Sequence, residues 1–233
     1  IGSGLVGSEM CIRDSYATLA ADRVGDKDAV MKYAQYALKD KENGQFAMQL
    51  LTDAYKAKGD TAKWVEKLQE GIVKFPENQY FFANLVDYYS SSNQNDKAMQ
   101  FADDMLAKDP NNKLYLYVKA YLYHNMKDYE KAIEFYKKTL DIDPAYAEAC
   151  SNLGLVYLLQ AQEYADKAPA DINDPNYATA QAEIKKFYEA AKPYYEKARE
   201  LKPDQKDLWL QGLYRVYYNL NMGPEFEEIE KMM

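Results

Sequence analysis

The chain is poor in the side chains that build metal sites and disulfide frameworks. Its 233 residues include one histidine and two cysteines, too few for zinc sites made of these residues or for a network of disulfides. No run of 18 apolar residues occurs, so we expect no membrane-spanning helix. We therefore expect no bound metal, and the search for function turns to surfaces.

Basic side chains are also in the minority. Lys and Arg number 29 against 37 Asp and Glu, a net charge of −8. Nucleic acids and anionic membranes are bound by basic surfaces that displace counterions from phosphates. The charge balance thus predicts neither kind of partner. With 48% hydrophobic residues the chain can nevertheless form a core, and its 23 tyrosines need an explanation.

Motifs for catalysis and cofactor binding are missing. The chain has no P-loop, H-E-x-x-H, G-x-S-x-G or C-x-x-C sequence. Gly2, Gly4 and Gly7 spell G-x-G-x-x-G, but this fingerprint functions only between a strand and a helix, and helices follow here. His124 lacks a nucleophile placed by any known motif, and Cys150 occupies a packing position. We predict a protein without enzymatic activity and without a cofactor.

Residues 1–15 differ from the rest in composition and periodicity. They resemble the translated read-through of a sequencing adaptor, so we interpret them as a non-native or disordered leader. The native chain would then begin upstream, and any targeting signal would lie there. This leaves the compartment open between cytoplasm and periplasm.

A repeat with a period of about 34 residues organises the remainder. Pro76, Pro110 and Pro144 are separated by exactly one period each, and Pro203 ends a fourth similar phrase. When the proline is counted as position 32, position 11 is a tyrosine in four successive units: Tyr55, Tyr89, Tyr123 and Tyr157. Apolar residues at i, i+3, i+4 and i+7 predict two amphipathic helices per unit, and each proline ends the second helix.

This pattern resembles the tetratricopeptide repeat (TPR). The strictest unit has Leu153, Gly154 and Tyr157 in its first helix, joined with Tyr195, Ala198 and Pro203 after an insertion. The resemblance covers residues 16–233 and implies an all-α, right-handed superhelical TPR solenoid in one domain. We expect a bacterial protein of this family.

Six helix-turn-helix units follow from the spacing of the prolines. The first unit is degenerate, and the last is a cap with a polar helix. The fifth unit carries a 25-residue insertion, which we predict to lengthen both of its helices into a projecting hairpin. Within the hairpin, Pro193 predicts a kink or a restart of the second helix. The approximate bounds of the units are 11–44, 45–78, 79–112, 113–146, 147–205 and 206–233.

In TPR proteins, positions 2, 5, 9 and 12 of the first helices face a concave groove that binds peptides, with position 6 at its edge. Several tyrosines fall at these positions rather than at packing positions, and tyrosine is favoured in binding surfaces. The alternative is that their rings pack against the neighbouring helix. The residues that we predict for a partner-binding groove are Tyr80, Asp87, Tyr117, Tyr121, His124, Asn152, Tyr214 and Tyr217.

A groove that grips the C-terminal carboxylate of a chaperone tail needs cations at positions 2, 5 and 6. Those positions hold Gln49, Ala83, Leu114 and other uncharged or acidic residues, so we predict no carboxylate clamp. We predict a scaffold that binds a protein or peptide. Two alternatives stay open: a structural component of a bacterial envelope or secretion assembly, and a regulatory region of a larger enzyme whose N-terminal part is missing.

Overall fold

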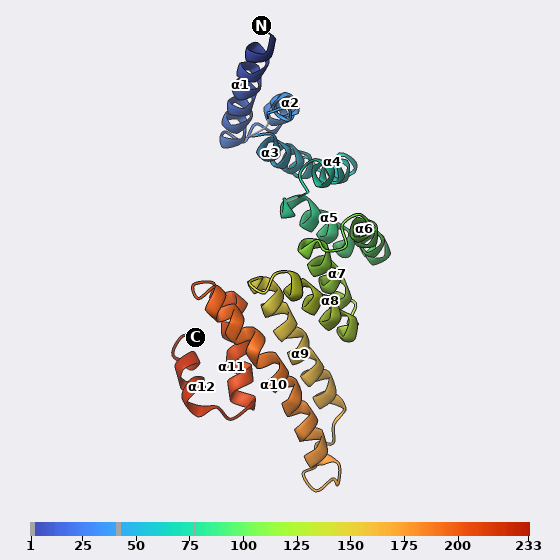
Figure 1. Ribbon diagram of the computed structural model, residues 1–233, viewed down its shortest axis with the longest axis vertical. Helices are drawn as coiled ribbons and strands as arrows, with labels where there is room; N and C mark the ends of the chain where they lie inside the picture. Colours follow the sequence, from blue (N-terminus) through green and yellow to red (C-terminus); the bar gives the residue numbers. More distant parts are fainter. Residues whose placement is uncertain (1–2, 41–42, 77) are drawn as a thin grey trace. The chain divides into compact units, whose positions relative to one another are not determined.

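The computed structural model is built of helices joined by short turns (Figure 1). It describes residues 3–40, 43–76 and 78–233, with side chains from Ile12 onward. The helices gather into two compact units, Ile1–Gln94 and Asn95–Met233, and each unit is described by itself. The boundary falls inside the predicted repeat 79–112, between its two helices.

Five helices form the first unit. Each packs against the next, and α1 also contacts α3. The predicted leader is helical from Ser3 onward, while Ile1 and Gly2 lie outside the described residues; that this segment is non-native remains a prediction. The helices are α1 (Ser3–Arg23), α2 (Lys27–Ala37), α3 (Gly44–Ala57), α4 (Thr61–Lys74) and α5 (Gln79–Ser91).

The second unit continues the same succession of packed neighbours. In addition, α7 contacts α9 and α9 contacts α11, so the first helices of successive repeats share one layer. Its elements are α6 (Asn95–Lys108), α7 (Lys113–Asn125), α8 (Tyr129–Ile142), α9 (Ala147–Lys167), α10 (Tyr177–Leu201), the short 3₁₀-helix η1 (Lys206–Leu208), α11 (Leu210–Asn219) and α12 (Gly223–Glu230).

The turn inside each of the first four repeats has the same backbone conformation. Gly25, Gly59, Asn93 and Lys127, which follow one another at the repeat period, all have positive φ values, of 75°, 74°, 57° and 60°. In three of these turns the next residue caps the second helix. Asp60 accepts from the N–H of Lys63 at 3.1 Å, and Asp26 and Asp128 cap α2 and α8 in the same way. A left-handed residue followed by an N-cap aspartate thus ends one helix and starts the next.

The last repeat shows the same turn one residue later than the prolines predict. Counting from Pro203 puts the left-handed position at Leu220, but the positive φ, 55°, belongs to Asn221. Met222 is accordingly the N-cap residue of α12. From η1 onward every repeat position is therefore shifted by one residue relative to the prediction.

The predicted insertion forms the long helices α9 and α10, which run side by side to a loop at residues 168–176 (Figure 1). The loop is capped internally, with the Asp171 carboxylate accepting from the N–H of Asn173 at 2.9 Å. Of the two outcomes predicted at Pro193, a kink or a restart, the restart does not occur, because α10 continues through this residue as one helix. Among the described residues, no helix is both long and apolar enough to cross a membrane.

Candidate peptide-binding surface

Two of the eight predicted groove residues, Tyr80 and Asp87, lie on α5 in the first unit. The other six lie in the second unit, where α7 and α9 bring four of them to one surface. We call this surface the α7–α9 patch; its members are Tyr117, Tyr121, His124 and Asn152.

Tyr117 is the fixed part of the α7–α9 patch. Its hydroxyl accepts a hydrogen bond from Nδ2 of Asn152 at 2.8 Å. Its ring lies 4.9 Å from the ring of Tyr146 and 5.8 Å from that of Tyr136. Because Tyr136 is fully buried, Tyr117 is anchored to the core. Tyr117 thus packs its ring against neighbouring residues, which is the alternative to a binding role that the sequence analysis left open.

Tyr121 and His124 form the more open part of the patch. Both are half-buried, and their rings lie 6.4 Å apart and nearly perpendicular. Nδ1 of His124 is buried and has no hydrogen-bond partner. Burial lowers the pKa of His124 below its ordinary value, so the imidazole is neutral at pH 7. It can accept or donate a hydrogen bond without carrying charge.

We expect this burial to make stability depend on pH in one direction. The unfolded imidazole, with a pKa of about 6.5, binds a proton before the folded one does. The stability that the protein has with a neutral His124 is therefore complete above the unfolded pKa. It is lost as the pH falls toward the lower pKa of the folded protein. Between about pH 7.5 and about pH 5.5, the urea midpoint should fall further in the wild type than in His124→Asn. As His124 is the only histidine, equal changes in both proteins would contradict the expectation.

On α5, the Tyr80 hydroxyl donates to the carboxylate of Asp53 on α3. Burial, together with this neighbouring carboxylate, raises the pKa of Tyr80 above its ordinary value. Asn78 caps α5 through the N–H of Tyr80 at 3.0 Å. Asp87 is exposed. On the first unit, the carboxylate of Asp53 thus holds the hydroxyl of Tyr80 in place.

One of the two predicted residues of α11 needs correction. Tyr217 is 4% exposed, and its hydroxyl donates to Oε1 of Glu196 at 3.0 Å; it is a core residue. Tyr214 packs against Phe226 with ring centroids 4.9 Å apart. The shift of one residue after Pro203 explains the error at Tyr217, since it moves this residue to position 11, where the other repeats carry their packing tyrosines.

The corrected count puts Arg215 and Tyr218 at the groove positions of α11. Tyr218 is 65% exposed and Arg215 half-buried. Sequence reasoning missed both, although an apolar stripe through Leu213, Val216 and Tyr217 was available as a signal of the buried face.

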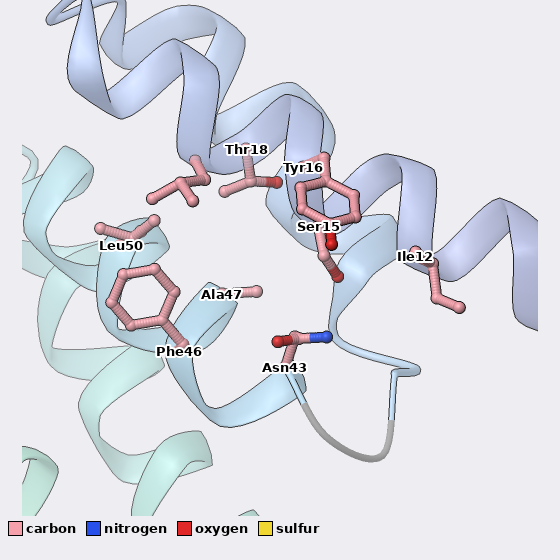
Figure 2. A pocket seen from close by; sticks show the side chains of 9 residues that line it. Ile12, Ser15, Tyr16, Thr18, Asn43, Phe46, Ala47 and Leu50 are labelled. Atoms are coloured by element: carbon pink, nitrogen blue, oxygen red, sulfur yellow. The ribbon is translucent and has the colours of Figure 1, made fainter.

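The first unit has a separate pocket between α1 and α3, with a volume of about 180 Å³. Figure 2 shows Phe46 and Leu50 of α3 on one side and Tyr16 and Thr18 of α1 on the other. Phe46 is 47% exposed and Tyr16 is 70% exposed. Because Ile12 and Ser15, which also line the pocket, belong to the predicted leader, we assign it no function.

The chemistry of the remaining candidates is limited. Cys150 is buried, and burial raises its pKa to about 11, so it is a protonated thiol at neutral pH. Within the part of the chain that the structure describes, no group of three His, Cys, Asp or Glu side chains could hold a metal ion. The site is thus an aromatic and amide surface.

Paired helices that recur at a constant period, with a shared left-handed turn, define a TPR-type scaffold. Residues 120–160 match the family model of the TPR repeat, a segment that contains Tyr121, His124 and Asn152. No curated protein matches the chain.

Solved structures agree on the fold. The crystal structure of PilW, a type IV pilus biogenesis factor, has a TM-score of 0.60 at 16% identity, covering 95% of this chain and 91% of that one. TTC0263, a TPR protein of Thermus thermophilus, has a TM-score of 0.54 at 16% identity, with coverages of 91% and 99%. The human IFIT1 dimer with m7Gppp-AAAA has a TM-score of 0.60 at 18% identity, with coverages of 94% and 49%. These comparisons confirm the all-α TPR fold class.

Proposed function

We propose that this protein is a non-enzymatic scaffold that binds a peptide segment of a partner protein at the α7–α9 patch. The observation that supports the proposal is that the patch combines two residues held in place by a hydrogen bond with two that are more open. Asn152 and Tyr117 are locked by their hydrogen bond, while the half-buried Tyr121 and His124 stand beside them. A rigid aromatic surface of this kind binds with little loss of side-chain entropy.

The polar groups of the patch favour a neutral or mildly basic peptide. Burial lowers the pKa of His124, so its neutral imidazole adds no positive charge that would repel a basic peptide. Glu148, one turn before Asn152 on α9, is half-buried and adds a negative charge. The net charge of −8 favours the same kind of ligand. Arg215 and Tyr218 extend the surface onto α11, which packs against α9.

We expect Tyr121 and His124 to dominate this binding. The probe is a phage-displayed pool of random short peptides selected on the whole chain, with selected sequences synthesised and measured by fluorescence anisotropy. The Tyr121→Ala, His124→Ala double variant should weaken binding by about 30-fold, as expected when aromatic anchors contributing ~2 kcal/mol are lost. Tyr117 is left intact because its ring supports Tyr136.

Tyr36→Ala is the matched control, since Tyr36 is an exposed tyrosine (52%) on the second helix α2. It should bind like the wild type, and all variants should keep their helical circular dichroism. A pool whose members all bind the double variant as tightly as the wild type would refute the proposed function.

A further inference from the structure

The last two helices of the second unit border an open hollow. It lies at the turn between α11 and α12, which pack against each other (Figure 1), and its volume is about 510 Å³. Its lining includes Tyr218 of α11, Met222 at the turn, and Gly223 and Phe226 of α12. None of these four residues belongs to the α7–α9 patch, and only Tyr218 also lies on the extension of that patch onto α11.

Two aromatic rings form the apolar side of the hollow. Tyr218 is largely exposed, and its ring centroid lies 5.7 Å from that of the half-buried Phe226. Ile229, three residues after Phe226 on α12, is fully buried and fixes this helix against the core. The rings therefore keep their places at the surface. The face of an aromatic ring attracts cations, so these rings favour a Lys or Arg side chain.

An acidic face of α12 continues from the hollow. Glu227 and Glu230 follow Gly223, which lines the hollow, by four and seven residues, and such positions share one side of a helix. Both glutamates are exposed. Within the described part of the chain, neither side chain has a hydrogen bond or an ion pair. Their carboxylates are therefore open to a cation from outside the chain.

The other charges of this region leave it negative. Residues 210–231 contain four glutamates against two cations, Arg215 and Lys231. A third cation, Arg199 of α10, is already paired with Glu228. A surface with an excess of one sign attracts ligands of the opposite sign. A Lys or Arg side chain meets both conditions, because its apolar stem can lie on the rings while its charged head reaches a carboxylate.

We propose that the hollow between α11 and α12 binds a basic segment of a partner protein. A Lys or Arg side chain of the segment lies across Tyr218 and Phe226, and its head pairs with Glu227 or Glu230. An uncharged or acidic segment lacks the group that these carboxylates would bind. The hollow is a second binding surface, which goes beyond the proposed function at the α7–α9 patch.

A phage-displayed pool of random short peptides tests this proposal when it is selected on the full-length Tyr121→Ala, His124→Ala variant. Ligands that need the α7–α9 patch do not enter this selection. We expect a class of peptides rich in Lys and Arg whose synthetic copies bind this variant and the wild type equally well in fluorescence anisotropy. Their binding should weaken about tenfold or more in Glu227→Lys, Glu230→Lys and in Tyr218→Ala.

The matched control is the Glu130→Lys, Asp141→Lys double variant. Both residues are exposed carboxylates on α8, so the net charge changes by the same amount while the hollow stays intact. At about 0.15 M salt, charges more than about 8 Å apart are largely screened, and this variant should bind the basic peptides like the wild type.

Equal weakening in both double variants would overturn the inference, because the peptides would then respond only to net charge. Unchanged binding to Tyr218→Ala, or a selection that yields no basic peptides, would overturn it as well. So would self-association in sedimentation that Tyr218→Ala abolishes, because the occupant would then be a second copy of the chain. Failure of the proposed function leaves these results unchanged, since the peptides are selected without Tyr121 and His124.

Discussion

We expect Tyr217→Ala to destabilise the protein strongly and Tyr218→Ala to leave it nearly unchanged. Tyr217 is 4% exposed and packs in the core cluster with Tyr195 and Leu213. Removing such a ring costs roughly 3–5 kcal/mol through lost burial and the cavity that remains. The partly buried carboxylate of Glu196 would also lose the hydroxyl that donates to it.

The neighbouring tyrosine is a matched control with the same chemistry. Tyr218 is 65% exposed and touches mainly Phe226, at 5.7 Å between ring centroids. Exposed residues of this kind usually change stability by no more than about 0.5 kcal/mol. Urea unfolding followed by circular dichroism compares the two variants. A small loss in Tyr217→Ala, no greater than that in Tyr218→Ala, would mean that the register predicted from Pro203 is correct, because that register places Tyr217 at an exposed groove position.

Gly212→Ala should also destabilise, although alanine favours helices over glycine by about 1 kcal/mol. A Cβ at Gly212 would lie 2.2 Å from Cε1 of Tyr195, and one at Gly154 would lie 2.7 Å from Cε2 of the same ring. The Tyr195 ring, 4% exposed, is thus confined between two glycines on α11 and α9 and cannot move aside. Overpacking of this kind costs roughly 1–3 kcal/mol beyond the gain in propensity.

Gly223→Ala is the control for that substitution, because nothing lies within 4 Å of its added Cβ. Its urea midpoint should equal or exceed that of the wild type. Combining Gly212→Ala with Tyr195→Leu should cost less than the sum of the single changes, because the smaller side chain removes the clash. Additive losses would show that the glycine acts through something other than the ring.

The repeat itself was readable from the sequence because local rules determine it. The turn residues Gly25 and Gly59 adopt positive φ easily, and Asp26, Asp60 and Asp128 follow such turns and cap the next helix. These choices depend on a few neighbouring residues. The long helices α9 and α10 follow the same local rules, since their apolar stripes extend those of the regular helices.

The candidate site was predictable only in part. Tyr121, His124 and Asn152 follow from repeat positions within an uninterrupted count. Tyr217 does not, because the left-handed turn of the last repeat lies one residue later than the count from Pro203 predicts, and only the apolar stripe through Leu213, Val216 and Tyr217 signals the buried face. A shift of one residue rotates a side chain by about 100° around a helix, enough to exchange the buried and the exposed face.

By itself, the sequence determined the helices, their turns and the period with which they recur, because hydrophobic spacing, caps and left-handed turns act over a few residues. Only the tertiary structure decided which tyrosines are buried, since that depends on contacts between repeats: Tyr217 against Glu196, and Tyr195 between Gly154 and Gly212.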